Sequence, residues 1–117
     1  MKKNKPTIII GNQAETVVAG YLKKQGHEVI TQNWRTKYCE IDIISKYKNC
    51  IYFTEVKYRK VSNWGDGLEA ITNKKLQQMN FAAKLWMSAN NWQNNAILAV
   101  ASVSGSDYKI DAFLEIT

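Results

Sequence analysis

The sequence predicts an α/β domain whose elements follow the order αβββαββ. Two segments repeat apolar residues at helical spacing, and five shorter runs are rich in β-branched and aromatic residues. Stretches containing glycine or polar residues separate these segments. With 117 residues and 45% hydrophobic content, the chain is long enough to bury a core of its own. One domain that folds without disulfides is therefore expected.

The first helix is expected over residues 12–25, and Gly26 follows it as a stop signal. Residues 1–10 are basic and include the only proline, Pro6, so they are expected to form a flexible arm. The folded domain then spans residues 11–117. The apolar side chains at helical spacing are Ala14, Val17, Val18, Tyr21 and Leu22.

Three strand-like runs come next, at residues 27–32, 38–46 and 50–58. A two-residue turn at Lys48-Asn49 joins the second and third runs as a hairpin. In this register Tyr47 lies opposite Cys50, and every other pair along the hairpin follows from it.

The second half of the sequence predicts a loop over residues 59–70, a helix and two strands. Thr72 is a suitable N-cap for the helix, which ends near Asn90. The strands are expected at residues 95–105 and 108–117, and the first is apolar enough to be buried on both faces of a sheet. The inward stripe of the helix consists of Leu76, Met79, Ala83 and Trp86.

The charge balance indicates an acidic partner. Sixteen Lys and Arg against ten Asp and Glu give a net charge of +6 and a pI of about 9.3, which favours nucleic acid. No apolar run approaches the ~20 residues that span a bilayer, and the N-terminal apolar run is too short for a secretory signal. The expected location is the cytoplasm, where Cys39 and Cys50 are reduced. With His27 as the only histidine, no Cys/His zinc site is expected.

Three carboxylates, Glu40, Asp42 and Glu55, interrupt the otherwise apolar hairpin. In the predicted register Asp42 faces Glu55 and Glu40 faces Lys57, with all four side chains on one face. Opposed Cβ atoms lie roughly 4.5 to 5.5 Å apart, so Asp42 and Glu55 can share a proton or bind one hard cation. The same alternation places Ile44 and Phe53 with the acids, and Ile41, Ile43, Tyr52 and Val56 on the reverse face.

A divalent cation held by carboxylates beside a lysine is suited to hydrolysing phosphodiester bonds. The ion acidifies a water and screens the phosphate. Lys57 then either positions or deprotonates that water, or stabilises the pentavalent anion. Oxygen ligands favour Mg²⁺ or Mn²⁺ over zinc. Glu40 is interpreted as an ion-pair partner of Lys57 in preference to a metal ligand.

Asp42 followed by Glu55-Val56-Lys57 resembles the PD-(D/E)xK nuclease signature. From Gly11 to about Trp86 the chain is similar to the YraN family, bacterial proteins described as uncharacterised or endonuclease-like and related in fold to archaeal Holliday-junction resolvases. The resemblance implies a restriction-endonuclease-like core, a mixed β-sheet flanked by helices. Cys39 departs from it, because the family usually has Gly there. The matching residues are Gly11, Glu15, Ala19, Tyr21-Leu22, Gly26, Asn33-Trp34-Arg35, Glu40-Ile41-Asp42, residues 55–59, Gly65, Glu69-Ala70 and Lys75.

The resemblance also implies roles for single residues. Asp42 and Glu55 would hold the metal, with the backbone carbonyl of Val56 as a further ligand. Lys57 would be the catalytic lysine, and Glu15 would match the helix glutamate that completes a resolvase site. A carboxylate in the first turn of a helix also meets the helix dipole favourably, which leaves a structural role open for Glu15.

The implied function is Mg²⁺- or Mn²⁺-dependent endonucleolytic cleavage of DNA at branched or distorted structures. A homodimer and no small-molecule cofactor are expected. Lys74 is an alternative to Lys75, and Trp64 either stacks on a base or packs. The candidates for phosphate contacts are Arg35, Lys37, Arg59, Lys60 and Lys75.

Two other functions stay open. A non-catalytic module on a nuclease fold would bind nucleic acid in a salt-dependent way without cleaving it. A small structural protein would use the carboxylates in ion pairs alone.

Overall fold

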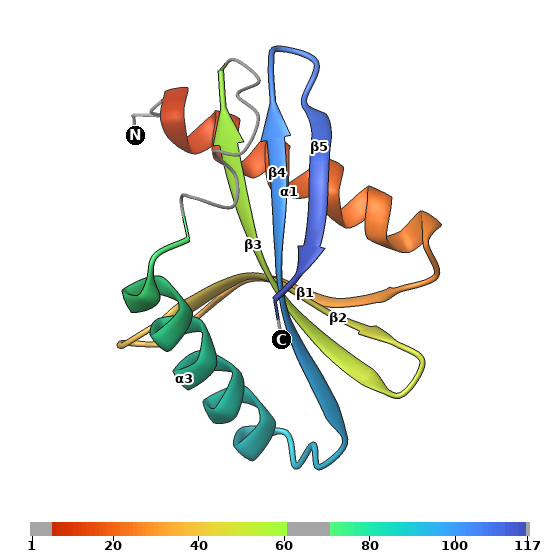
Figure 1. Ribbon diagram of the computed structural model, residues 1–117, viewed down its shortest axis with the longest axis vertical. Coiled ribbons are helices and arrows are strands. Elements are labelled where there is room, and N and C mark those ends of the chain that lie inside the picture. The colour runs from red at the N-terminus through yellow and green to blue at the C-terminus, as the bar shows by residue number, and fades with distance from the viewer. Residues whose placement is uncertain (1–5, 61–70, 117) are drawn as a thin grey trace.

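Five strands form one mixed sheet that carries a helix on each face (Figure 1). The computed structural model describes residues 6–60 and 71–116. The strands lie side by side in chain order, with β3 and β4 parallel and all other neighbours antiparallel. The prediction of a mixed α/β fold is confirmed. The strands are β1 (Glu28–Arg35), β2 (Glu40–Tyr47), β3 (Cys50–Arg59), β4 (Asn95–Ser104) and β5 (Lys109–Glu115).

Helix α1 (Pro6–Lys24) covers one face of the sheet, behind it in the view of Figure 1. It begins six residues before the predicted start at residue 12, so the predicted arm is helical from Pro6 onward. Proline is well tolerated at a first helical position, because its missing N–H would have no partner there. Residues 1–5 of the predicted arm lie outside the described residues. The helix is followed by Gly26, whose φ of 101° fits the predicted stop.

The face below α1 is a cluster of small and branched side chains. Close packing of alanines and valines lets the helix approach the strands, which brings its polar positions near the sheet as well. The buried members are Ala14, Val18, Ala19 and Leu22 from α1, Ile43 from β2, and Ala101 and Val103 from β4.

Helix α3 (Asn73–Ala89) covers the opposite face, in front of the sheet in Figure 1. Its buried side chains are Met79, Ala82, Ala83 and Trp86. The predicted inward stripe is confirmed for Met79, Ala83 and Trp86. Its fourth member, Leu76, is only half-buried. Trp86 meets Phe53 of β3 edge-on, with ring centroids 5.8 Å apart. Of the predicted loop over residues 59–70, the part from residue 61 onward, including Trp64, lies outside the described residues.

Thr72 caps α3 as predicted. Its backbone is extended, and its hydroxyl oxygen accepts a hydrogen bond from the N–H of Lys75 at 3.0 Å. The cap therefore fixes the first turn of the helix, from which Lys75 projects.

Replacing Thr72 with alanine should lower the free energy of unfolding by about 1 kcal/mol, because one N–H of the first turn loses its acceptor. Thr72→Ser keeps the hydroxyl and should stay within about 0.5 kcal/mol of the unmodified protein. Urea denaturation measures both. An equal loss in the two variants would show that the methyl group, not the cap, carries the effect.

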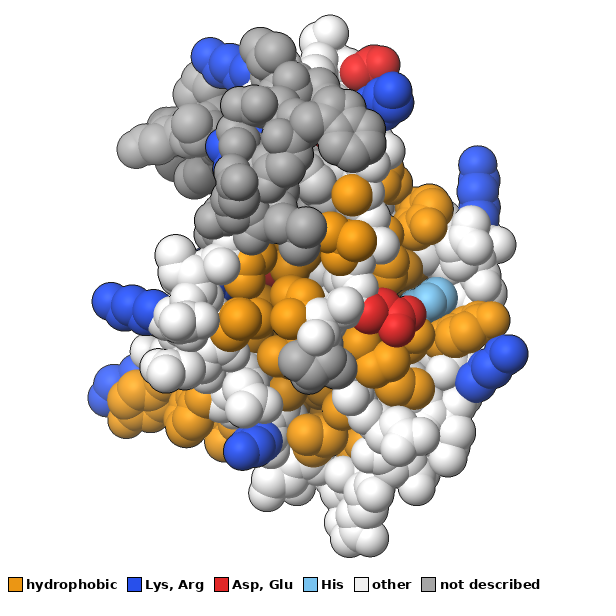
Figure 2. All heavy atoms as spheres, in the orientation of Figure 1, with side chains coloured by type: hydrophobic (Ala, Val, Ile, Leu, Met, Phe, Trp, Pro, Cys, Tyr) orange, Lys and Arg blue, Asp and Glu red, His pale blue; other side chains and the backbone are white. Residues whose placement is uncertain are grey.

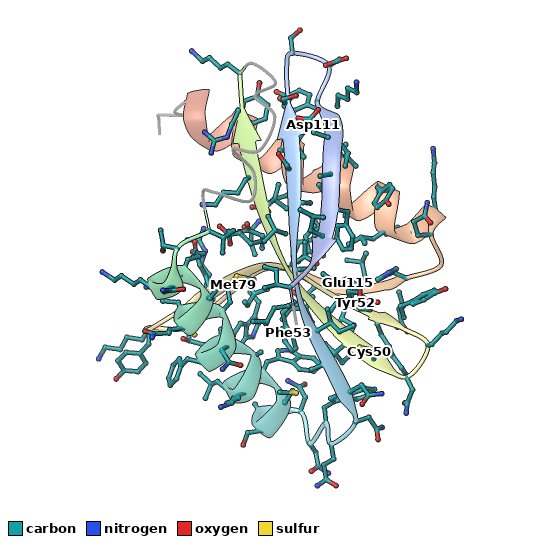
Figure 3. All side chains as sticks on the ribbon, viewed as in Figure 1. Cys50, Tyr52, Phe53, Met79, Asp111 and Glu115 are labelled. Atoms are coloured by element: carbon teal, nitrogen blue, oxygen red, sulfur yellow. The ribbon has the colours of Figure 1, made fainter. Side chains whose placement is uncertain are left out.

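A cluster of aromatic side chains near the β2–β3 turn connects β3 with β5, on the other side of β4. Tyr52 donates a hydrogen bond from its hydroxyl to Glu115 Oε2 at 3.0 Å, and the two side chains lie side by side in Figure 3. Burial and the nearby Glu115 carboxylate raise the pKa of Tyr52 to about 12, so the phenol stays protonated and donates. His27 stacks against Tyr47 and accepts or donates a hydrogen bond with the buried Ser45 at 2.9 Å. These contacts are structural.

Among the described residues, neither helix is long and apolar enough to cross a membrane.

Candidate functional site at the fork between β2 and β3

Strands β2 and β3 separate at the position of the predicted acids. They pair from Tyr47–Cys50 to Ile43–Thr54, which confirms the predicted register. Beyond that point β2 continues beside β1 and β3 continues beside β4. The sheet thus divides into a fork, and Asp42 and Glu55 are the first residues past its vertex. Carboxylates that would destabilise a continuous ladder lie where the ladder has ended.

Asp42 closes the vertex of the fork. Its Oδ2 accepts a hydrogen bond from the N–H of Val56 at 2.8 Å. In a continued antiparallel ladder this N–H would bond to the carbonyl of Ile41, so the side chain takes over a backbone partner. A strand residue directs its N–H and C=O to the same neighbour, so we infer that the Val56 carbonyl also points into the fork.

The fork interrupts the alternation of side chains along β2. Ile41 and Ile44 both belong to the cluster under α3, while Ile43 belongs to the cluster under α1. The prediction that Ile41 and Ile43 share a face is therefore wrong, because a period of two holds only along a regular ladder. Asp42 interacts electrostatically with Glu55 of β3 and, to a smaller extent, with Glu15 of α1.

Glu15 reaches the fork from α1. The helix begins at Pro6, so Glu15 is not in the first turn, and the helix-dipole interpretation is wrong. Its side chain is buried, which raises its pKa, and the Asp42 and Asn33 side chains oppose that shift. Its Oε1 has no hydrogen-bond partner among the described residues. A buried carboxyl oxygen without a partner is unfavourable unless something else binds it.

The sequence reasoning missed Asn33. It lies in β1 with a φ of 53°, a left-handed conformation that asparagine adopts more readily than most residues. A polar residue with this tolerance inside a strand-like run was the available signal. Its contact with Glu15 makes it a support of the site.

Burial is the largest cause that raises the pKa of Asp42, to about 7, and the charge of Glu55 adds to it. The hydrogen bond from Val56 opposes the shift. Burial likewise raises the pKa of Glu15. Both carboxyl groups are therefore harder to ionise than in water, and a cation bound beside them would favour their charged forms.

Glu55 meets two lysines. It is 8% exposed, and its Oε2 lies 3.4 Å from Lys57 Nζ while its Oε1 lies 3.4 Å from Lys75 Nζ. Lys57 comes from the same strand, and Lys75 comes from the first turn of α3. Of the two lysines considered at this position, the structure brings Lys75 to the acids, and Lys74 is exposed.

The outer acid, Glu40, pairs with Arg35 across β1 and β2, with Arg35 Nε 3.6 Å from Glu40 Oε1. The predicted pair between Glu40 and Lys57 is wrong, because the strands that carry them have already parted. Both side chains of the Arg35–Glu40 pair are exposed, so it adds little stability.

The other predicted phosphate contacts lie around the periphery. Lys37 and Lys60 are exposed, and Arg59 is half-buried at the end of β3. On the face shown in Figure 2, Lys and Arg side chains lie mainly around the rim and hydrophobic side chains gather at the centre. The surplus positive charge on this face is therefore spread out, not concentrated in one patch.

The oxygen donors at the fork fit a hard divalent cation. The carboxylates of Asp42 and Glu55 and the carbonyl of Val56 are ligand types that Mg²⁺ and Mn²⁺ prefer, and waters complete such sites. The unpaired Oε1 of Glu15 is a further buried oxygen of α1, but it is not counted among the ligands. In the part of the chain that the structure describes, no three His, Cys, Asp or Glu side chains converge to hold a metal. The candidate set is thus two carboxylates with one carbonyl.

Comparison with known proteins identifies the family of the chain. The model of the uncharacterised protein family UPF0102 matches residues 14–112. The chain belongs to this family. A UPF0102 protein of Vibrio parahaemolyticus is 41% identical over 73% of this chain and 70% of its own length. UPF0102 proteins of Cytophaga hutchinsonii (33% identical, 86% and 88% covered) and Clostridium novyi (35% identical, 96% and 94% covered) match more of the chain.

The match confirms the resemblance to the YraN-like family and covers both the helix with Glu15 and the fork. The names of these relatives state no activity, so the function is inferred from the site.

Proposed function

We propose that this UPF0102 protein is a Mg²⁺- or Mn²⁺-dependent endonuclease of the PD-(D/E)xK superfamily, with a restriction-endonuclease-like core. Its substrate is DNA, at branched or distorted structures. The observation that supports the proposal most is the fork, where the half-buried Asp42 and the buried Glu55 follow its vertex and Lys57 Nζ lies 3.4 Å from Glu55 Oε2. Mutually unfavourable charges kept together at one point are typical of functional sites.

Each residue at the fork has a role in this proposal. A divalent ion bound by Asp42, Glu55 and the Val56 carbonyl would acidify a water and screen the phosphate. Glu15 adds a negative charge near Asp42 that raises the pKa of that carboxyl. Lys57 donates to the attacking water or to the charge that develops on the phosphoryl oxygens. Lys75, on the α3 side of Glu55, contacts a phosphate of the bound strand.

One observation favours a non-catalytic nucleic-acid-binding module as the second candidate. The two lysines at 3.4 Å already neutralise Glu55, so this carboxylate is satisfied without a metal. Under this alternative the lysines and the peripheral cations bind phosphates, and binding weakens steeply with salt.

The nuclease proposal is tested with end-labelled DNA in branched, flapped, single-stranded and linear duplex form. With Mg²⁺ or Mn²⁺ the purified protein should cleave at least one of these forms, and EDTA should prevent cleavage. Glu55→Ala should abolish the activity, because it removes one ligand and the partner of Lys57. Glu28→Ala removes an exposed carboxylate at the start of β1 and should leave the rate unchanged.

Cleavage that persists in Glu55→Ala would show contamination. Salt-sensitive DNA binding by the unmodified protein without metal-dependent cleavage would favour the binding module. Sedimentation of the same preparation, with and without a branched duplex, tests the expected homodimer.

A further inference from the structure

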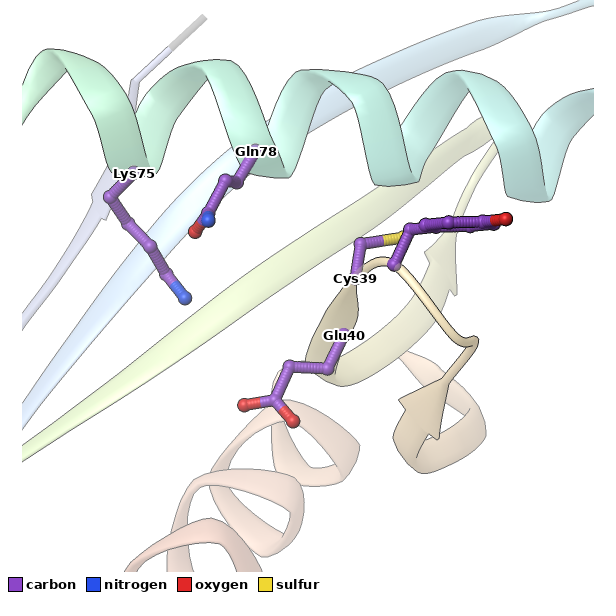
Figure 4. Close-up of a pocket in the computed structure, with 5 residues that line it drawn as sticks. Cys39, Glu40, Lys75 and Gln78 are labelled. Atoms are coloured by element: carbon purple, nitrogen blue, oxygen red, sulfur yellow. The ribbon is translucent and has the colours of Figure 1, made fainter.

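A pocket of about 290 Å³ lies beside the fork, between the first half of α3 and the segment that enters β2. Figure 4 shows Lys75 and Gln78 projecting from α3 toward Cys39 and Glu40. This volume is near the lower limit of small-ligand sites, about 300 Å³, so it admits a compact planar group. Its lining residues are Tyr38, Cys39, Glu40, Lys75 and Gln78.

The pocket is continuous with the candidate catalytic site through one side chain. Lys75 lines the pocket, and its ammonium group lies 3.4 Å from Glu55 Oε1. A ligand in the pocket would therefore be next to whatever is bound at the fork. For a nucleic-acid substrate, that position corresponds to the nucleotide adjoining the scissile phosphate.

Tyr38 is the one aromatic residue among the described residues that line the pocket. Tyr38 is 74% exposed, which is unusual for a large aromatic residue. The backbone that carries it is held in place, because Thr36 Oγ1 accepts hydrogen bonds from the N–H groups of Tyr38 at 3.1 Å and Cys39 at 3.2 Å. The N–H of Thr36 in turn donates to the Cys39 carbonyl at 2.8 Å. The Lys37 ammonium lies over the Tyr38 ring, 5.8 Å from its centroid, so the other face of the ring is the one on which a base could stack.

The polar lining complements a nucleobase. The amide of Gln78 offers a donor and an acceptor, and Glu40 offers acceptors, which is the mixture that base edges require. The ammonium of Lys75 suits a phosphate on the side facing the fork. Each of these groups lines the same pocket.

On the basis of the proposed function, we propose that this pocket binds an unpaired DNA nucleotide beside the scissile phosphate. Tyr38 stacks on the base, Gln78 and Glu40 bind its edge, and Lys75 contacts its phosphate. In an intact duplex both faces of a base are covered by neighbouring bases, so Tyr38 can stack only where a strand is unpaired or a base is turned out. The substrate class is therefore DNA with single-stranded segments, such as flaps and junction arms.

Binding in EDTA tests the pocket separately from cleavage. A series of oligothymidylates carries one fluorescent aminopurine, moved along the strand one position at a time. With the unmodified protein, stacking should quench the fluorophore most strongly at one position. Tyr38→Ala should weaken binding about tenfold and remove the quenching, whereas Tyr38→Phe should keep both. Phe81→Ala is the matched control, because Phe81 is also an exposed aromatic residue, at 52%, but does not line the pocket.

An oligonucleotide with an abasic residue at the quenched position completes the design. It should bind the unmodified protein and Tyr38→Ala equally well, since no base is left to stack. Equal affinity of Tyr38→Ala and the unmodified protein for the intact oligonucleotide would overturn the pocket assignment, and Mg²⁺-dependent cleavage lost in Glu55→Ala would then still support the nuclease. Position-dependent quenching without any cleavage would support the pocket and refute the nuclease. Absence of binding to every oligonucleotide would overturn the pocket assignment, whereas the nuclease is decided by the cleavage assay on branched and flapped DNA.

Discussion

Replacing Lys57 with alanine is expected to lower the rate of Mg²⁺-dependent DNA cleavage at saturating substrate by about 10²- to 10³-fold, the usual effect of losing one preorganised donor to developing charge. The affinity for DNA should change little, because Lys57 is proposed to act in the transition state. Its ammonium group is also already paired with Glu55, 3.4 Å away. Single-turnover cleavage and binding in EDTA measure the two quantities separately.

Lys75 provides a matched comparison within the same site. It also lies 3.4 Å from Glu55, but on the other carboxyl oxygen and at the end of the pocket. Lys75→Ala should weaken DNA binding and reduce the salt dependence of binding by about one counterion, while the rate at saturation falls much less. If the two alanine variants lost affinity alike and kept the rate, both lysines would be simple ion-pair partners of Glu55.

The β2–β3 hairpin and the start of α3 could be predicted from the sequence because each signal was local. The turn at Lys48-Asn49 fixed the hairpin register, and branched residues marked β2 and β3. The structure adopts this turn with Lys48 at a φ of 55°, although the pair lacks the favoured Asn-Gly order. Likewise Thr72 marked the start of α3, since a cap requires only its own hydroxyl and the next turn.

The fork could not be predicted, because it depends on three strands at once. Nothing in the hairpin sequence shows that β2 follows β1 past Ile43 while β3 follows β4. An uninterrupted hairpin was assumed, so Ile41 and Ile43 were assigned to one face and Glu40 to the wrong partner. The choice of Asp42 and Glu55 rested on their residue types and on the hairpin register, and that register holds as far as Ile43 and Thr54.

The pocket could not be predicted from local sequence patterns either. Tyr38 and Gln78 are 40 positions apart and belong to opposite walls, and only the packing of α3 against β2 brings them together. An exposed tyrosine in a polar turn is common in sequences and carries no signal by itself. Lys75 was selected through family resemblance, and the structure gives it a physical reason, its contact with Glu55.

Asp42→Asn should stabilise the metal-free protein relative to the unmodified protein, and this stabilisation should be larger at about pH 8 than at about pH 4. The pKa of Asp42 is raised from 3.8 to about 7 in the folded state. Between these values the folded protein holds a proton that the unfolded chain has released, so the stability of the unmodified protein falls as pH rises. The Asn variant has no such proton, and the difference between the two should grow by about 2 to 4 kcal/mol over this range.

Urea denaturation in EDTA across this pH range measures the difference, and Asp111→Asn is the control because it makes the same chemical change at an exposed position of β5. Parallel profiles for Asp42→Asn and the unmodified protein would show that burial does not strain this carboxyl. Adding Mg²⁺ at about pH 8 should then stabilise the unmodified protein, because a ligand that binds only the folded state raises its stability. The Asn variant should gain much less, since it lacks one of the two carboxylates at the fork. A cation that relieves the charge of Asp42 beside Glu55 explains both the pH effect and its reversal, whereas a purely structural pair of acids explains only the first.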